Sequence, residues 1–436
     1  MASEQMRCPE CGEPVPVTPG FVTWCPACDW GLDLDLRAEE AGVRARWWSR
    51  IVTRLAQTAH DPAQRRDGRA FSAQLLFATG LLLALLAPAV SIVLAVGGIA
   101  LIVTNTAYPM IVGVGVVLVL LAIVFRPRLP RLGGEQLSWR EDSPFARSLR
   151  AAAQQVGRPL PRRVRMLPLA ATTVLTTSFA GRRELLLDPV VWTVLSGGAR
   201  EAVLTRALAR ETRPARACQV IAAVAFGTTV HWLSLAGGSG TTAYAEADTA
   251  LAARDPLVYY ESAAAYSRAR RQRWVQGFAR FTEVVLVAVV RVYLRPLTLC
   301  LLPSWHRGDY GADAAAAGVT SGSALREALE AELLAEPLLR IAARPLGPDE
   351  TRTRLEVVRD HRAATPDSEV ERLRRLDVAR IGSGQVLVAP NLWRARRLAG
   401  NQVQSAAAPA KRDMAADRDP EIERCLEQIL ERLRSR

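Results

Sequence analysis

The sequence is almost devoid of lysine and poor in histidine. Only one of its 56 basic residues is a lysine, Lys411. This bias towards arginine, with abundant alanine, is typical of a GC-rich genome, so the net charge of +13 is weak support for nucleic-acid binding. The four histidines are too few for a histidine-rich metal site, and no two of them have the His-x-x-x-His spacing of a helical metal-binding pair.

Cysteine is scarce outside one short region. Seven cysteines in 436 residues exclude a disulfide framework as the basis of the fold. Four lie within the first 28 residues, and the others are isolated at Cys218, Cys300 and Cys425. The first 70 residues contain no long apolar run, so we expect no signal peptide.

Charge is absent from one long stretch of the chain. Half of all residues are apolar, which excludes a disordered protein, and the 56 residues from Ala70 to Phe125 include no Asp, Glu, Lys or Arg. Because a bilayer span needs about 20 apolar residues, the stretch predicts a transmembrane hairpin of two helices, Leu75–Val103 and Met110–Phe125. The polar turn Thr104–Pro109 would join them. A buried soluble hairpin is the alternative.

Arginines flank this hairpin on both sides and are missing from its turn. Basic residues remain cytoplasmic, so the region before the hairpin and the region after Arg126 are both predicted to begin in the cytoplasm. We expect a multi-pass protein of the cell membrane, in contact with the lipid bilayer. Hydrophobic segments near 217–244 and 281–302 could add two spans, but the basic cluster Arg268–Arg273 would then lie outside, so the number of spans stays open.

Two Cys-x-x-Cys pairs, Cys8/Cys11 and Cys25/Cys28, are separated by 13 residues. Two such knuckles supply four thiolates to a tetrahedral Zn²⁺, which predicts a structural zinc ribbon over residues 1–36. Free or redox-active thiols are the alternative. Since acidic residues outnumber basic ones here, we expect a protein partner rather than nucleic acid. Trp24 and Trp30 are expected to pack against the ribbon.

The segment 37–72 contains an amphipathic helix near Val43–Leu55. Its apolar face is formed by Trp48, Ile51, Val52 and Leu55, with most of the arginines opposite. The pattern predicts either a helix lying in an anionic membrane interface or a helix packed on the cytoplasmic domain, about equally.

The region 127–330 alternates short strands with helices. Periodicity and turn signals predict the following elements: helix Pro144–Val156, strands Arg163–Leu167, Thr173–Phe179 and Glu184–Leu187, and helices Pro189–Leu195 and Gly198–Arg210. A further helix, Ser323–Ala343, crosses into the remaining region, 331–436. There, helices are predicted over Val370–Leu376 and Glu421–Leu433, with a linker at Gly400–Pro420, and no chemistry is assigned to this region.

The order of these parts resembles the HtpX-type membrane metallopeptidases, especially actinobacterial members with an N-terminal zinc ribbon. The resemblance covers Cys8 to about Leu329. It rests on four stretches: RCPECG…FVTWCPACDW, FRPRLPRL, FAGRRELLLDPVVWTVLSGGAREAVLTRALAR and HRGDYGADAAAAG. It implies an α-rich α+β membrane protein with a zinc ribbon, a transmembrane helical hairpin and a zincin-like domain containing a small sheet.

In that family a helix with the motif H-E-x-x-H binds a catalytic Zn²⁺, and a later helix supplies a glutamate ligand. At the matching positions this sequence has Arg206, Ala207 and Arg210, with Asp309 and Asp313 on the later helix. A guanidinium has no free lone pair for zinc, and alanine cannot accept a proton from water. The resemblance therefore implies a pseudopeptidase without a catalytic zinc ion.

Such a chain is expected to act as a membrane scaffold or regulator. An active zinc endopeptidase with a relocated site and a membrane-tethered zinc-ribbon adaptor for a protein partner are the alternatives. If the fold is retained, Arg206 and Arg210 are predicted to face Asp309 and Asp313 as buried ion pairs in place of the metal. Arginines that point to solvent are the competing expectation.

Overall fold

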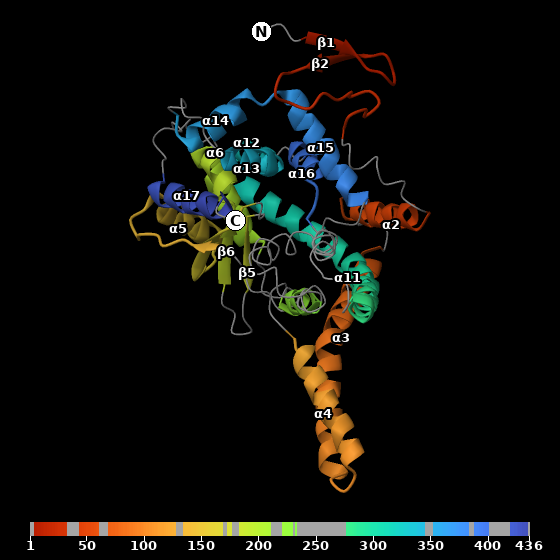
Figure 1. The fold of residues 1–436 in the computed structure, drawn as a ribbon. Helices are drawn as coiled ribbons and strands as arrows, with labels where there is room; N and C mark the ends of the chain where they lie inside the picture. Colours follow the sequence, from red (N-terminus) through yellow and green to blue (C-terminus); the bar gives the residue numbers. More distant parts are fainter. Residues whose placement is uncertain are drawn as a thin grey trace.

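The structure is a computed structural model of the chain. It describes residues 4–32, 43–60, 69–127, 134–168, 172–176, 183–210, 220–229, 232, 276–344, 352–382, 388–400 and 419–434. The described part is rich in helix with two small sheets (Figure 1). Cys218, the basic cluster Arg268–Arg273 and the predicted linker Gly400–Pro420, apart from its ends, lie outside these residues.

The N-terminal unit is a two-stranded antiparallel ribbon. Strand β1 (Glu4–Arg7) pairs with β2 (Pro14–Val17), with Met6 opposite Val15. Its small core consists of Cys8, Val15 and Cys25, with Trp30 packed against it. The ribbon lies against two C-terminal helices, α14 (Arg354–Ala364) and α15 (Asp367–Gly382), at the end of the molecule away from the hairpin (Figure 1).

A four-stranded sheet supports one side of the body, in the order β3-β4-β6-β5. Strand β4 (Arg163–Met166) is parallel to β6 (Arg183–Leu187), and β6 is antiparallel to β5 (Thr173–Thr176). The two-residue strand β3 (Glu135–Gln136) pairs antiparallel with β4. The predicted strands at 163–167 and 184–187 are confirmed in position, and the predicted strand 173–179 is confirmed over its described residues, 173–176. Glu184 and the three leucines of β6 are buried.

Helices on both sides of the predicted boundary at 330 share one body. Helix α5 has the predicted limits, Pro144–Val156, with Ser143 as its N-terminal cap, and packs on α7 (Gly197–Ala209). The core joins these and α6 (Pro189–Val194) to α13 (Ala335–Ala343), α14 and α17 (Pro420–Arg434). The predicted helix Ser323–Ala343 is two helices, since α12 (Gly322–Leu333) ends at Leu334 before α13 begins.

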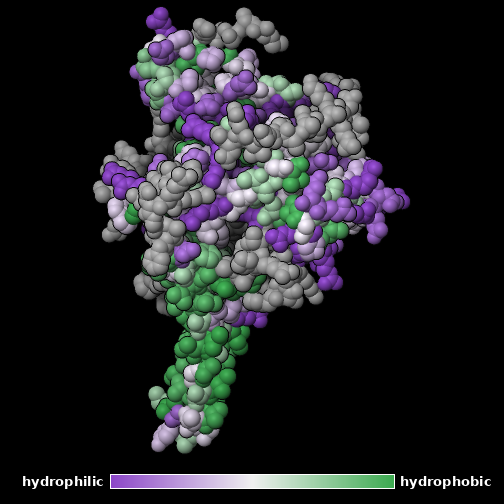
Figure 2. All heavy atoms as spheres, turned by 180° about the vertical axis from the view of Figure 1, so that it is seen from behind, coloured by the Kyte–Doolittle hydropathy of each residue, from purple (hydrophilic) through white to green (hydrophobic). Residues whose placement is uncertain are grey.

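A helical hairpin projects from this body (Figure 1). Helix α3 (Arg69–Thr104) and α4 (Pro109–Val124) meet at the predicted turn. Within the described residues, Gln74–Thr104 is the one helix long and apolar enough to cross a membrane, and only 12% of its most apolar window is buried. The projecting surface is almost uniformly hydrophobic (Figure 2), with side chains such as Leu82, Val93 and Val103 about 70% exposed.

The hairpin joins the body through one long helix, α11 (Gln276–Val319). It contains both the hydrophobic segment near 281–302 and the segment with Asp309 and Asp313, which are therefore not separate elements. A cluster of Ala84, Val290, Leu294, Leu297 and Leu301, with residues of the helix Val220–Thr229, fixes α3 against it.

The amphipathic helix α2 (Val43–His60) packs on protein. Val52 and Ala56 are buried against Leu302 of α11 and Trp393 of α16 (Asn391–Gly400). Of the two expectations for this helix, packing on the body is confirmed, and the orientation with that face in the membrane interface is wrong. The apolar face is covered because α11 and α16 offer it an apolar surface.

Two glycines bring α3 and α4 into close contact. A Cβ atom added to Gly98 would lie 2.7 Å from the carbonyl oxygen of Gly115 and 2.8 Å from Cγ2 of Val119. The substitution Gly98→Ala should therefore separate the helices and lower the free energy of unfolding by about 1–3 kcal/mol. Unfolding of the purified chain in detergent micelles measures this.

The neighbouring substitution Gly97→Ala is the matched control. A Cβ atom there meets nothing within 4 Å, and alanine favours a helix over glycine at both positions. The control variant should be at least as stable as the native chain. Equal stability of the two variants would contradict the close helix contact.

Candidate functional site

The four predicted metal ligands converge in the ribbon. The sulfurs of Cys8, Cys11, Cys25 and Cys28 all lie within 4.8 Å of one another. The Cys8–Cys28 and Cys11–Cys25 sulfur distances are 3.6 and 3.5 Å, and none of the four forms a disulfide. Tetrahedral Zn²⁺ with bonds of about 2.3 Å places its sulfurs about 3.8 Å apart. The residues therefore fit a metal ion of this type.

The thiols of this cluster differ in acidity. Although burial alone disfavours the thiolate of Cys8, the amides of Cys11 and Glu10 favour it and lower its pKa to about 7. Although the amide of Trp30 favours the thiolate of Cys28, burial and the neighbouring sulfurs raise its pKa to about 12. A bound dication would offset this mutual repulsion, because it attracts every thiolate and so favours release of the thiol protons.

The second site lies at the C-terminal end of α7, where the resemblance would place a catalytic metal. Helix α7 is fixed at its start by Ser196, whose amide and hydroxyl bond to the carboxylate of Glu327 at 2.8 and 2.7 Å. Arg206 and Arg210 lie one turn apart at its other end. Ala207, between them in sequence, is buried in the apolar core.

Two predicted arginine–aspartate pairs are present. Nε of Arg210 lies 3.0 Å from Oδ1 of Asp309, and Nε of Arg206 lies 3.9 Å from Oδ1 of Asp313. Arg206 thus lies opposite Asp313, and Arg210 lies opposite Asp309. This order is expected when two helices run antiparallel and each carries two charges one turn apart. The prediction that these arginines face these aspartates is confirmed, and the expectation that they point to solvent is wrong.

Two further members of this site come from the region to which the sequence assigned no chemistry. Arg394 of α16 forms a bidentate pair with Asp313, at 2.7 and 2.6 Å. Nη1 of Arg206 lies 3.0 Å from Oε1 of Glu332 of α12, and Arg394 lies 3.7 Å from the same carboxylate. Three arginines thus face three carboxylates, and we call these six residues the ion network: Arg206, Arg210, Arg394, Asp309, Asp313 and Glu332.

Apart from Arg210, which is partly exposed, the ion network is withdrawn from water. The side chains of Arg394 and Asp313 are 1% and 4% exposed. Although burial alone would raise the pKa of Asp309, the guanidinium groups of Arg210 and Arg394 and the amide of Ala389 hold it below its usual range. Asp309 therefore stays ionised at neutral pH, and all three carboxylates lie beside arginines, which cannot be deprotonated in proteins.

One sequence signal pointed to Glu332. It follows Leu325 and Leu329 on the buried face of α12, at spacings of seven and three residues. A carboxylate on an apolar stripe requires a partner. In the sequence, Arg394 lies close to the apolar residues Pro390, Leu392 and Trp393, so its guanidinium is also expected to need an acidic partner. Which carboxylate becomes that partner depends on how α16 packs.

This arrangement leaves no ligand set for a catalytic metal among the six residues. A guanidinium cannot coordinate Zn²⁺, and each carboxylate is engaged with a cation. The described residues contain one cluster of histidine, cysteine or carboxylate side chains with the geometry of a metal site, and it is the ribbon cluster. His306, near Asp309 in sequence, is fully buried.

No protein-family model matches the chain, and no curated protein or solved structure matches it.

Removing Arg394 tests the energetic role of the ion network. The substitution Arg394→Met keeps the apolar stem but removes the bidentate partner of Asp313. Asp313 and Glu332 then remain as buried charges that share only Arg206, which lies 3.9 Å from Asp313 and 3.0 Å from Glu332. We expect the free energy of unfolding to fall by about 3–5 kcal/mol. Chemical denaturation followed by circular dichroism measures it.

The control is Arg340→Met. Arg340 pairs with Glu336 at 3.2 Å, but these side chains are 70% and 51% exposed, so the loss should stay below about 1 kcal/mol. Similar losses in the two variants would show that the ion network adds little beyond an ordinary surface pair.

Proposed function

We propose that this chain is a non-catalytic membrane protein, a pseudopeptidase of the HtpX type that acts as a scaffold or regulator for a protein partner. The observation that supports it best is the ion network. Where the resemblance calls for two histidines and a glutamate, the chain has Arg206, Arg210 and buried Ala207. The three carboxylates around them are neutralised by arginine rather than left open for a metal.

In this proposal the ion network has a structural role. Three guanidinium groups replace the positive charge of a metal ion. Ion pairs join α7 to α11 and α12, and charge-assisted hydrogen bonds join α16 to α11. Hydrolysis of a peptide would need a group that activates water, and neither a guanidinium nor the alanine at position 207 can accept that proton.

The membrane part of the proposal rests on the hairpin. Helix α4 has 16 residues, which at 1.5 Å per residue is about 24 Å, somewhat less than the hydrocarbon thickness of about 30 Å. The exposed apolar surfaces of α3 and α4 require a hydrophobic environment. We propose that both cross the bilayer, with the ribbon and the body in the cytoplasm, because the arginines lie before and after the hairpin and not in its turn.

The ribbon is proposed to hold one structural Zn²⁺ on Cys8, Cys11, Cys25 and Cys28. The sulfur distances and the absence of disulfides among these residues support this assignment. The metal would supply the folding energy of a unit whose apolar core comprises only a few residues.

Zinc stoichiometry of the purified full-length chain tests the proposal. We expect one zinc per chain, none in a variant with all four ribbon cysteines changed to serine, and no metal-dependent cleavage of casein by either. One zinc confined to the ribbon follows from the ion network, because its arginines exclude a second metal.

A second zinc that survives the four cysteine substitutions, together with casein cleavage that a chelator abolishes, would contradict the proposal and restore the endopeptidase alternative. The variant Arg340→Met, on an exposed pair, serves as a control for the handling of the protein in these assays.

A further inference from the structure

The second cysteine knuckle of the ribbon holds an arginine from helix α15. Nη1 of Arg375 lies 2.7 Å from the carbonyl oxygen of Pro26 and 2.7 Å from Oδ1 of Asp29. Its Cζ lies 5.1 Å from the centre of the Trp24 ring. A carboxylate, a carbonyl and an aromatic face are the three groups that bind a guanidinium, and an ammonium would use them less well.

All three groups belong to the knuckle itself. Trp24 precedes Cys25, Pro26 follows it, and Asp29 follows Cys28. Asp29 has a φ of 59°, the only positive φ among the described non-glycine residues, and its amide donates to the carbonyl of Cys25 at 2.9 Å. The turn that brings the two sulfurs together is therefore the turn that aims the Asp29 carboxylate at Arg375.

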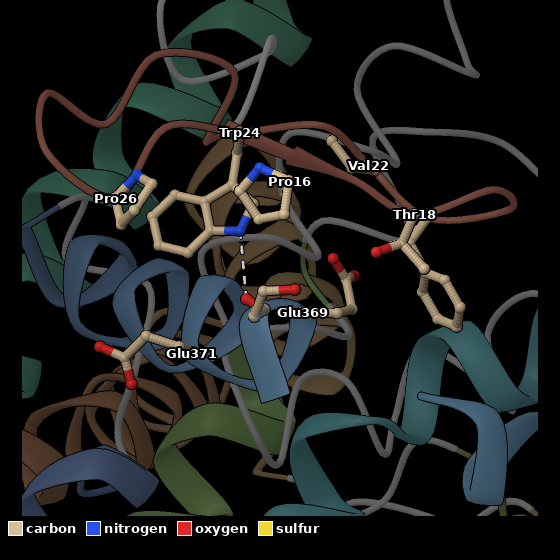
Figure 3. A pocket seen from close by; sticks show the side chains of 9 residues that line it. Pro16, Thr18, Val22, Trp24, Pro26, Glu369 and Glu371 are labelled. Atoms are coloured by element: carbon tan, nitrogen blue, oxygen red, sulfur yellow. Dashed lines mark hydrogen bonds between the residues drawn. The ribbon is translucent and has the colours of Figure 1, made fainter. Parts of the chain in front are cut away.

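Other contacts also join the ribbon to α14 and α15. Nε1 of Trp24 donates to the carbonyl of Ser368 at 3.1 Å, as Figure 3 shows. Arg372 donates to the carbonyl of Leu32 at 2.9 Å, and the Phe21 ring stacks on His361 of α14 at 5.3 Å. A pocket of about 170 Å³ lies between the ribbon and α15 and is lined by residues of both (Figure 3). Contact between the two units is thus concentrated at a few polar and aromatic groups.

We propose that the segment Trp24–Asp29 is an arginine-binding site whose ligand in this chain is Arg375, and that metal binding at the four cysteines forms it. This inference rests on the zinc ribbon of the proposed function. Without the metal, the ribbon keeps only the small core of Cys8, Val15 and Cys25, which cannot hold the knuckle in one conformation. The ribbon therefore docks on α14 and α15 only when the metal is bound.

The test uses the full-length chain in detergent micelles, with zinc content and amide hydrogen exchange measured together. Asp29→Asn keeps a residue that tolerates positive φ but removes the charge facing Arg375. We expect exchange in the first half of α15 to become roughly twofold to fivefold faster at unchanged zinc content. Arg375→Ala removes the ligand from the other side and should give the same result with the knuckle untouched.

Glu13→Gln is the matched control, because it makes the same change of charge at an exposed position beside the first knuckle. It should alter neither zinc content nor exchange. Removal of zinc with EDTA should accelerate exchange in α15 at least as much as Asp29→Asn, since the contacts of Trp24 and Arg372 are lost as well.

Two results would overturn the inference. One is unchanged protection of α15 after the zinc has been removed. The other is unchanged protection in both Asp29→Asn and Arg375→Ala while zinc remains bound. A native chain that binds no zinc would instead overturn the zinc ribbon of the proposed function, and the arginine site with it, so the two failures are distinguishable.

Discussion

The ion network holds together helices that are far apart in the chain. Its six charges come from α7, α11, α12 and α16, and each helix contributes at least one of them. Burial of a single charge would cost several kcal/mol, so the arrangement is stable only when all four helices are in place. This requirement makes the helical body a unit, and α11, which contains two of the carboxylates, then fixes the hairpin relative to it.

Pairs of opposite charges also connect the ribbon to that body. Arg375 contacts the ribbon, and its neighbour Arg374 pairs with Glu330 of α12 at 2.6 Å. Glu330 lies two residues before Glu332 of the ion network. Charged groups therefore link the ribbon to α15, and α15 to α12. Apolar contacts instead dominate around the hairpin and the sheet.

Much of the fold could be predicted because local signals determine it. The uncharged stretch and its polar turn indicated the limits of α3 and α4, and apolar periodicity indicated those of α5. The helix containing Ser323 to Ala343 was predicted as one because Leu334 carries no helix-breaking signal. Helices α14 and α16 were not predicted, since their apolar positions are few and their burial comes from neighbours distant in sequence.

By itself, the sequence determined the four cysteines that form the possible metal site and the apolar hairpin, because spacing and side-chain chemistry are properties of the chain. It also predicted which aspartates face Arg206 and Arg210. Only the tertiary structure decided that Arg394 and Glu332 complete the network, that α2 packs on protein, and that Trp24 and Asp29 bind Arg375. The physical reason is that a buried charge demands a partner but does not specify one, and the partner is chosen by how distant helices pack.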